Sequence, residues 1–268
     1  MGAREAAAWR RLRAQVGDQA PLLTAPDPLA RGLCELCWRP ARPGRAHCYQ
    51  CDLYGEYLPG LLPDVVVPVA YAAKGGPHAT NLWRYKSSRP GAGPAAPGAA
   101  APGAAAAAAA AALRALLLVF LRDHGGCVWR RARAPSPSHV AVVPSGRGRS
   151  GEHPLRQLAA PYLALTWVEL STARVDDPPA GPDPSRFQAP RLDGASVLLL
   201  DDTWTSGASA TSASAALRLA GARSVAVVVL GRHLDAAPVP GAGDGGPSPL
   251  AMPFRPWLCA VHAPRPTQ

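Results

Sequence analysis

The sequence has few lysines and few large aromatic side chains, and both shortages limit its possible functions. Lysine occurs only at Lys74 and Lys86, so arginine supplies nearly all of the basic residues behind the formal charge of +10. Aromatic residues make up 6% of the 268 residues, which leaves few platforms for stacking single-stranded nucleic acid. The basic balance therefore admits an anionic partner, either nucleic acid or a phosphorylated metabolite, without choosing between them.

The sequence also lacks the signatures of export and lipid attachment. Its first 18 residues mix charges with alanine and contain no uninterrupted apolar core. The start MGAREA has neither Ser nor Thr at its sixth position, so the myristoylation pattern fails. The longest apolar tract, 104–120, is mostly alanine and is interrupted by Arg114, which favours a soluble helix. We therefore expect a cytoplasmic protein with no membrane partner and with reduced thiols.

Four of the six cysteines form two C-x-x-C pairs, CELC and CYQC, with ten residues between them. Each pair directs two thiolates toward one ion, and two pairs complete a closed tetrahedral site that suits structural Zn²⁺. Two disulfides are disfavoured in a reducing compartment, and a redox dithiol needs only one pair. Cys127 and Cys259 are expected to be ordinary residues. The predicted zinc ligands are Cys34, Cys37, Cys48 and Cys51, with neighbouring His47 as a less favoured substitute.

Apolar runs alternate with helical segments along most of the remaining chain. Such alternation is typical of an α/β fold with a parallel sheet covered on both faces. The expected strands are 64–72, 138–144, 166–171, 196–201 and 224–231. The expected helices are 76–86, 104–123, 152–165 and 212–222, and a long loop rich in proline and charge covers 172–194.

These elements predict four parts of the chain. They are an N-terminal helix and linker (1–30), a zinc-binding module (31–58), an α/β domain (64–231) and an irregular tail rich in glycine and proline (232–268). A low-complexity insert at about 87–103 interrupts the α/β domain.

The stretch VLLLDDTWTSGAS, residues 197–209, leads a buried strand into two carboxylates and a loop of small residues. The loop precedes a helix, whose N-terminal N–H groups bind phosphate. Asp201 and Asp202 would repel a phosphate, but they suit the hydroxyls of an adjoining sugar or a bridging Mg²⁺. A ribose 5-phosphate fits this combination. The predicted phosphate-binding residues are Thr205, Ser206, Gly207, Ala208 and Ser209.

The same stretch resembles the phosphoribosyl-pyrophosphate (PRPP) signature of type I phosphoribosyltransferases. Together with the cysteine module, the VPVAYAAKGG…LWRYK stretch and the VVPS strand, it resembles the ComF family of competence-associated phosphoribosyltransferase-like proteins. The resemblance implies a type I phosphoribosyltransferase-like parallel sheet flanked by helices, preceded by a small four-cysteine zinc module. It also implies a glycosyltransferase that binds PRPP with Mg²⁺ and transfers phosphoribose to a nitrogen nucleophile, releasing pyrophosphate.

The resemblance further implies roles for individual residues. Asp201 and Asp202 would hold the ribose hydroxyls and serve catalysis, either by stabilising positive charge at the ribose or as a base. The loop after the 138–144 strand would hold pyrophosphate. Its candidate contacts are Ser145, Arg147 and Arg149, and Arg174 and Arg186 would contribute from the loop over the active site.

Two departures from the family pattern leave other interpretations open. Thr203 and Trp204 replace aliphatic residues of the signature, and GRSGEHPL stands where ComF-like proteins commonly carry an RGFNQ-type run. One alternative is a non-catalytic competence or DNA-uptake protein that binds single-stranded DNA or a nucleotide, and another is a scaffold without ligand. A hydrolase is disfavoured because no nucleophile elbow or persuasive Ser-His-Asp order is present. No residue identifies an acceptor base.

Overall fold

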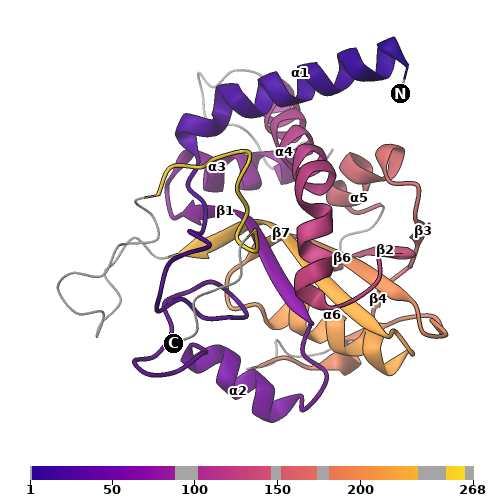
Figure 1. Ribbon diagram of the computed structural model, residues 1–268. Coiled ribbons are helices and arrows are strands. Elements are labelled where there is room, and N and C mark those ends of the chain that lie inside the picture. Colours follow the sequence, from indigo (N-terminus) through magenta and orange to yellow (C-terminus); the bar gives the residue numbers. More distant parts are fainter. Residues whose placement is uncertain (1, 88–101, 146–151, 174–180, 235–251, 263–268) are drawn as a thin grey trace.

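Five apolar runs of the sequence form one parallel sheet in the computed structural model, which describes residues 2–87, 102–145, 152–173, 181–234 and 252–262 (Figure 1). The strand order is β1-β7-β6-β2-β3, and every neighbouring pair is parallel. The strands are β1 (Val65–Ala73), β2 (His139–Val142), β3 (Thr166–Trp167), β6 (Ser196–Trp204) and β7 (Ser224–Leu234).

Helices cover both faces of this sheet, which confirms the predicted α/β class with a parallel sheet (Figure 1). One face carries α1 (Ala3–Gln19), α3 (Pro77–Arg84), α4 (Pro102–Ala132) and α5 (Pro154–Ala159). The other carries α2 (Tyr49–Tyr57) and α6 (Ala208–Leu219). Short 3₁₀ turns are η1 (Ala20–Leu22), η2 (Tyr85–Ser87), η3 (Ala160–Tyr162) and η4 (Pro184–Arg186).

Alternate side chains of β6 enter two different apolar clusters, as expected for a strand buried on both faces. Leu198 and Leu200 pack in the cluster that contains the leucines of α4. Val197 and Leu199 pack in the cluster that contains α6 and the four cysteines of the two C-x-x-C pairs. The cysteine module therefore shares a hydrophobic core with the sheet.

Helix α4 is the main cover of one face and is longer than its alanine-rich sequence predicts. It continues through two glycines to Ala132 because Cys127, Val128 and Trp129 are buried, and this packing offsets the low helix propensity of glycine. Among the described residues it is the one helix long and apolar enough to cross a membrane. Half of its most apolar stretch is buried inside the fold.

Several element boundaries differ from those predicted, and in each case the pairing partner explains the difference. Strand β6 runs to Trp204 because Thr203 and Trp204 stay paired with Gly231 and Arg232 of β7. Strand β7 itself runs to Leu234, opposite the last residue of β1, so the predicted irregular tail begins with three strand residues.

The strand predicted at 166–171 is two short strands with different partners. Strand β3 pairs with β2 in the main sheet, whereas β4 (Ser171–Thr172) pairs with β5 (Phe187–Gln188) in a separate antiparallel pair. Helix α6 begins at Ala208, four residues earlier than predicted. The left-handed backbone of Gly207, with φ of 84°, makes this early start possible by turning the chain directly into the helix.

Candidate functional site

The two predicted carboxylates lie near the carboxyl end of β6, at the edge where parallel sheets bind ligands. They belong to the paired strand, so their side chains alternate between its two faces. Asp202 is buried, with 6% of its surface exposed, and Asp201 is half-buried. The two neighbours therefore have different surroundings and different chemistry.

Asp202 is bound by two side chains from the turn after α3. Lys86 Nζ donates to Asp202 Oδ1 at 2.7 Å, and the Tyr85 hydroxyl donates to Oδ2. The Lys86 side chain is 30% exposed, so it reaches Asp202 from the solvent side. The sequence indicated no role for these two residues beyond their place in the LWRYK stretch. Only the fold brings them to an aspartate that lies 117 positions after Tyr85 and 116 after Lys86.

Asp201 has a pKa raised to about 7. Burial is the largest cause, and the charge of Asp202 adds to it, while Lys86 opposes the shift. A carboxyl group that titrates near neutral pH can exchange a proton at little cost. Asp201 therefore titrates in the range that proton transfer near neutral pH requires, and Asp202 is paired with the Lys86 ammonium group.

The loop after β6 wraps over the indole of Trp204, which is 1% exposed. A Cβ built on Gly207 would lie 2.1 Å from the Trp204 Cζ2 atom, and the φ of 84° also disfavours any other residue. Trp204 thus supports the loop from below. Glycine is required at this position by both contact and conformation.

The 205–209 loop presents hydroxyl groups around the start of α6. Thr205 and Ser206 are exposed and Ser209 is half-buried. Ser206 Oγ accepts from the Ala208 N–H at 3.3 Å, and the N-cap residue, Gly207, has no side chain with which to cap the helix. The first turn of α6 therefore carries the partial positive charge and N–H donors that favour an anion.

Arg232 holds this loop in place from inside the protein, with 2% of its surface exposed. Its Nη1 donates to the carbonyl oxygens of Trp204 at 2.9 Å and Thr205 at 2.7 Å. Its Nε donates to the carbonyl oxygen of Cys37 at 3.0 Å. One buried guanidinium thus connects the 205–209 loop to the cysteine module, a connection that no sequence motif indicates.

A tyrosine on α2 provides a second link between the module and the loop. Burial raises the pKa of Tyr54, and a hydrogen bond with the Ser206 side chain partly opposes that shift. Tyr54 itself is 1% exposed. The cysteine module therefore contacts the loop through both a side chain and its backbone.

The four predicted cysteines converge into one buried group, which we call the four-cysteine cluster. Their sulfur atoms all lie within 4.8 Å of one another, and Cys37 Sγ lies 3.7 Å from Cys48 Sγ. Two sulfurs bound to zinc at about 2.3 Å in a tetrahedron are about 3.8 Å apart. The structure thus confirms a group that can hold a structural metal ion. Its members are Cys34, Cys37, Cys48 and Cys51.

Hydrogen bonding within this cluster lowers the pKa of two of its thiols and raises the pKa of the other two, Cys37 and Cys51. The Cys37 N–H lies 3.5 Å from Cys34 Sγ, and Cys48 is the N-cap of α2, where the helix dipole stabilises negative charge. Hydrogen bonds from the other three cysteines lower the pKa of Cys34. Hydrogen bonding within the cluster also lowers the pKa of Cys48 to about 6, although Cys34 acts in the opposite direction.

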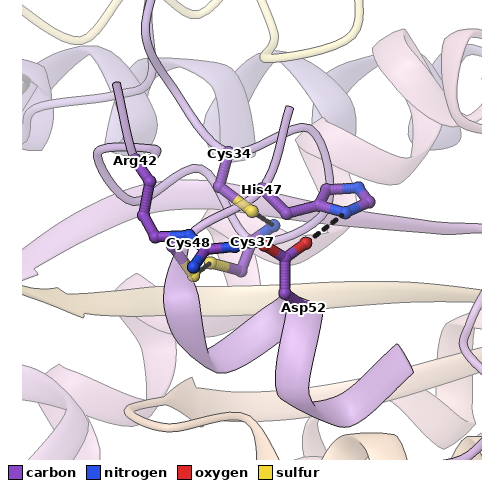
Figure 2. Close-up of polar contacts among 6 residues, drawn as sticks. All are labelled: Cys34, Cys37, Arg42, His47, Cys48 and Asp52. Atoms are coloured by element: carbon purple, nitrogen blue, oxygen red, sulfur yellow. Dashed lines mark hydrogen bonds and ion pairs between the residues drawn. The ribbon is translucent and has the colours of Figure 1, made fainter. Parts of the chain in front are cut away.

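His47, the substitute ligand considered from the sequence, has a different partner. Its Nδ1 lies 3.3 Å from Asp52 Oδ1, and Arg42 binds the other oxygen of the same carboxylate (Figure 2). These three polar side chains lie beside the cysteines, and the metal-binding group itself consists of cysteines alone.

The predicted pyrophosphate loop is placed only in part. Val143 N–H donates to Leu200 O at 2.9 Å, so the chain after β2 continues beside the aspartates of β6 and Ser145 lies at the same sheet edge. Arg147, Arg149 and Arg174 lie outside the described residues. Arg186 belongs to η4, and its guanidinium lies 5.7 Å from the centre of the Phe187 ring.

No family model, curated protein or solved structure matches this chain in the three comparisons that we made. The comparisons therefore assign no family to the chain, and its function has to be inferred from the residues of the site.

Proposed function

We propose that this chain binds PRPP, or another ribose 5-phosphate ligand, at the carboxyl edge of β6. The observation that carries the proposal is the continuity of three features. Two neighbouring carboxylates, a glycine-dependent loop and a helix N-terminus follow one another from Asp201 to Ala208. Carboxylates accept hydroxyl groups and helix N-termini accept phosphate, so the order matches a phosphorylated sugar.

Different residues of the site bind different parts of the ligand. The 205–209 loop binds the 5-phosphate, and the aspartates accept the ribose hydroxyls. The pyrophosphate of PRPP brings Mg²⁺ with it, since that ion prefers phosphate oxygens and one or two carboxylates. Ser145 lies at the same edge and is proposed to contact the pyrophosphate.

The reaction that follows from this arrangement is transfer of phosphoribose to a nitrogen nucleophile. The bond between the anomeric carbon and the pyrophosphate oxygen breaks as the nucleophile attacks, and the pyrophosphate leaves with the electron pair. Carboxylates beside the ribose stabilise the positive charge that develops there, and Asp201 can take a proton from the nucleophile. Lys86 and Tyr85 hold the Asp202 carboxylate in position through their hydrogen bonds.

The four-cysteine cluster is proposed to bind Zn²⁺ in a structural role. Four sulfur ligands leave no open coordination position for a substrate. Because Arg232 connects Cys37 to the 205–209 loop, the metal would support the site from below without taking part in the chemistry.

The proposal is tested by titrating PRPP with Mg²⁺ into the full chain by calorimetry. The double variant Asp201→Asn/Asp202→Asn removes both carboxylates and should bind at least about 100-fold more weakly, because each charged hydrogen bond contributes about 1.5–3 kcal/mol. Asp193→Asn is the matched control. This aspartate is exposed and has a φ of 42°, a conformation that asparagine tolerates.

Absence of binding by the folded wild type, or equal binding by the double variant, would contradict the proposal. Single-stranded DNA is titrated in parallel. A DNA affinity that falls steeply with salt, without PRPP binding, would support the DNA-binding alternative instead. Once PRPP binding is established, release of pyrophosphate in the presence of individual nucleobases would identify the acceptor.

A further inference from the structure

A second group of metal-ligating side chains lies away from the four-cysteine cluster, on the α4 side of the sheet. His124 and Cys127 come from α4, and Cys259 and His262 come from the 252–262 segment, drawn in yellow in Figure 1. Their ligand atoms all lie within 4.8 Å of one another. We call these four residues the histidine–cysteine cluster. The sequence-based expectation that Cys127 and Cys259 are ordinary residues overlooked this convergence.

Each half of the cluster has the geometry of a two-ligand chelate. His124 and Cys127 are three positions apart on a helix and so project from the same face. The 259–262 turn is closed by a hydrogen bond from His262 N–H to Cys259 O of 3.0 Å, which brings its two end residues together. Two residues separate the ligands in each half, as in the pairs of the four-cysteine cluster.

The distances fit one small ion. Cys127 Sγ lies 4.0 Å from His262 Nδ1. A tetrahedral zinc with Zn–S of about 2.3 Å and Zn–N of about 2.0 Å sets such a pair about 3.6 Å apart. The two imidazole rings are nearly perpendicular, at 83°, with centroids 6.1 Å apart. A movement of a few tenths of an ångström in one exposed side chain, His262, brings the pair to bonding geometry.

His124 provides the most specific observation. It is 4% exposed, and its Nε2 lies 2.8 Å from the carbonyl oxygen of Pro256. This contact makes Nε2 the protonated nitrogen and leaves Nδ1 with a lone pair. The Nδ1 atom is buried and has no hydrogen-bond partner among the residues that the structure describes. A histidine whose second nitrogen donates to a carbonyl is the usual arrangement of a metal ligand.

Charge in the cluster is also consistent with a cation held by thiolates. Arg130 Nη2 lies 3.3 Å from Cys127 Sγ, so a hydrogen-bond donor contacts one of the two sulfur atoms. Two thiolates balance one divalent ion, and the two imidazoles bind as neutral ligands. Sulfur and imidazole ligands in a tetrahedral set favour zinc over magnesium or calcium.

Two simpler explanations account for less. A Cys127–Cys259 disulfide would use neither histidine, and both cysteines are free thiols in the structure. Ordinary core packing accounts for the buried sulfurs, but it leaves the Nδ1 atom of His124 buried without a partner among the described residues, which is costly. A bound metal ion satisfies all four ligand atoms together.

We propose that the histidine–cysteine cluster binds one Zn²⁺ and fastens the 252–262 segment to α4. With two sulfurs and two nitrogens, all four coordination positions are filled by protein, so the ion is structural. The segment continues toward the sheet, where Phe254 N–H donates to Leu23 O at 3.0 Å and Thr24 bridges to Tyr71 of β1. The second ion thus anchors the C-terminal segment that closes this side of the core.

Metal content and X-ray absorption of the full chain, purified under reducing conditions with zinc, test the proposal together. The wild type should contain about two zinc ions per chain with an average shell of about three sulfurs and one nitrogen. One zinc ion with an all-sulfur shell, no zinc, or a Cys127–Cys259 disulfide under these conditions would overturn it. A lone zinc ion with mixed sulfur and nitrogen ligands would support it and count against the four-cysteine site instead.

Variants assign the second ion to its residues. Cys259→Ser should lose one of the two zinc equivalents, and His139→Ala, a half-buried histidine outside both clusters, should retain both. Retention of both by a folded Cys259→Ser protein would contradict the assignment. If Cys259→Ser does not fold, the mixed sulfur and nitrogen shell of the wild type still decides the question.

Discussion

The four-cysteine and histidine–cysteine clusters differ most in how far apart along the chain their ligands lie. All members of the four-cysteine cluster fall between residues 34 and 51, in a pattern that is visible in the sequence. The histidine–cysteine cluster joins α4 to a segment near the C-terminus, and Cys127 and His262 are 135 positions apart. Short spacing reveals a metal site to a reader of the sequence, whereas long separation hides one.

The two clusters also differ in what surrounds them. The four-cysteine cluster is connected to the 205–209 loop through Arg232, which binds Cys37 and the carbonyl groups of Trp204 and Thr205. The histidine–cysteine cluster packs against α4 and the C-terminal segment. Substitutions in the four-cysteine cluster should therefore weaken ligand binding at the proposed site. Substitutions in the histidine–cysteine cluster should affect only the α4 side of the sheet.

The largest effect is expected from Cys37→Ser, which removes one sulfur from the four-cysteine cluster. Loss of a structural metal ion should cost on the order of 5 kcal/mol or more, comparable with the total stability of a domain. Thermal unfolding should begin at a much lower temperature, and PRPP binding should be lost. Cys259→Ser is the paired variant. If it weakened PRPP binding as strongly as Cys37→Ser, the proposed difference between the clusters would be wrong.

The next largest effect concerns pH and Asp201, whose pKa is raised to about 7. Between the unfolded value near 4 and pH 7 the folded state binds more protons, so stability falls as pH rises through this range. The loss should total on the order of 2–4 kcal/mol, and Asp201→Asn should abolish it. Urea unfolding of both proteins between pH 4 and 8 measures the difference. An unchanged pH dependence in the variant would show that another group is responsible.

This substitution separates stability from function. At pH 8 Asp201→Asn should be more stable than the wild type and should bind PRPP more weakly, because the carboxylate destabilises the fold where it serves the ligand. A parallel loss of both properties would mean that Asp201 is a structural residue.

An effect of comparable size is expected from Arg232→Met, which breaks the connection between the cysteine module and the 205–209 loop. The variant leaves carbonyl groups without their charged donor, at a cost of about 1–3 kcal/mol. PRPP binding should weaken while the zinc content stays unchanged. Arg232→Lys is the control that keeps the charge but loses the planar guanidinium. Its PRPP affinity should lie between those of the wild type and Arg232→Met. Wild-type PRPP affinity in a folded Arg232→Met protein would contradict the role given to this connection.

The smallest effect is expected from Arg13→Ala, which breaks a surface ion pair of 2.6 Å between α1 and Asp123 of α4. The arginine side chain is 57% exposed, so stability should change by no more than about 1 kcal/mol. Asp123 directly precedes His124, yet the metal content should remain that of the wild type. A lost zinc equivalent would indicate that the histidine–cysteine cluster depends on the packing of α1.

Sequence patterns predicted the features that depend on neighbouring residues. The parallel sheet followed from continuous apolar runs, and the four-cysteine cluster followed from its two C-x-x-C pairs. The extension of β6 through Trp204 could not be predicted in this way, because it depends on pairing with Gly231 and Arg232 of another strand. The patterns describe what each segment prefers, and the partner strand determines where it ends.

The same distinction applies to the candidate site. The acidic pair and the 205–209 loop are contiguous in the sequence, so they could be singled out before the fold was known. Lys86 and Arg232 come from other strands or turns and reach the site only through tertiary packing. Lys86 binds Asp202 and Arg232 holds the 205–209 loop, but no spacing in the sequence relates either residue to its partner.

A crystal structure of the full chain, grown with Mg²⁺ and PRPP, is the most direct test of the proposed function. We predict electron density for the 5-phosphate at the N-terminus of α6, within hydrogen-bond distance of backbone N–H groups of the 205–209 loop. The ribose should lie against Asp201 and Asp202. PRPP bound elsewhere, or an empty loop in protein saturated with the ligand, would contradict the proposed function.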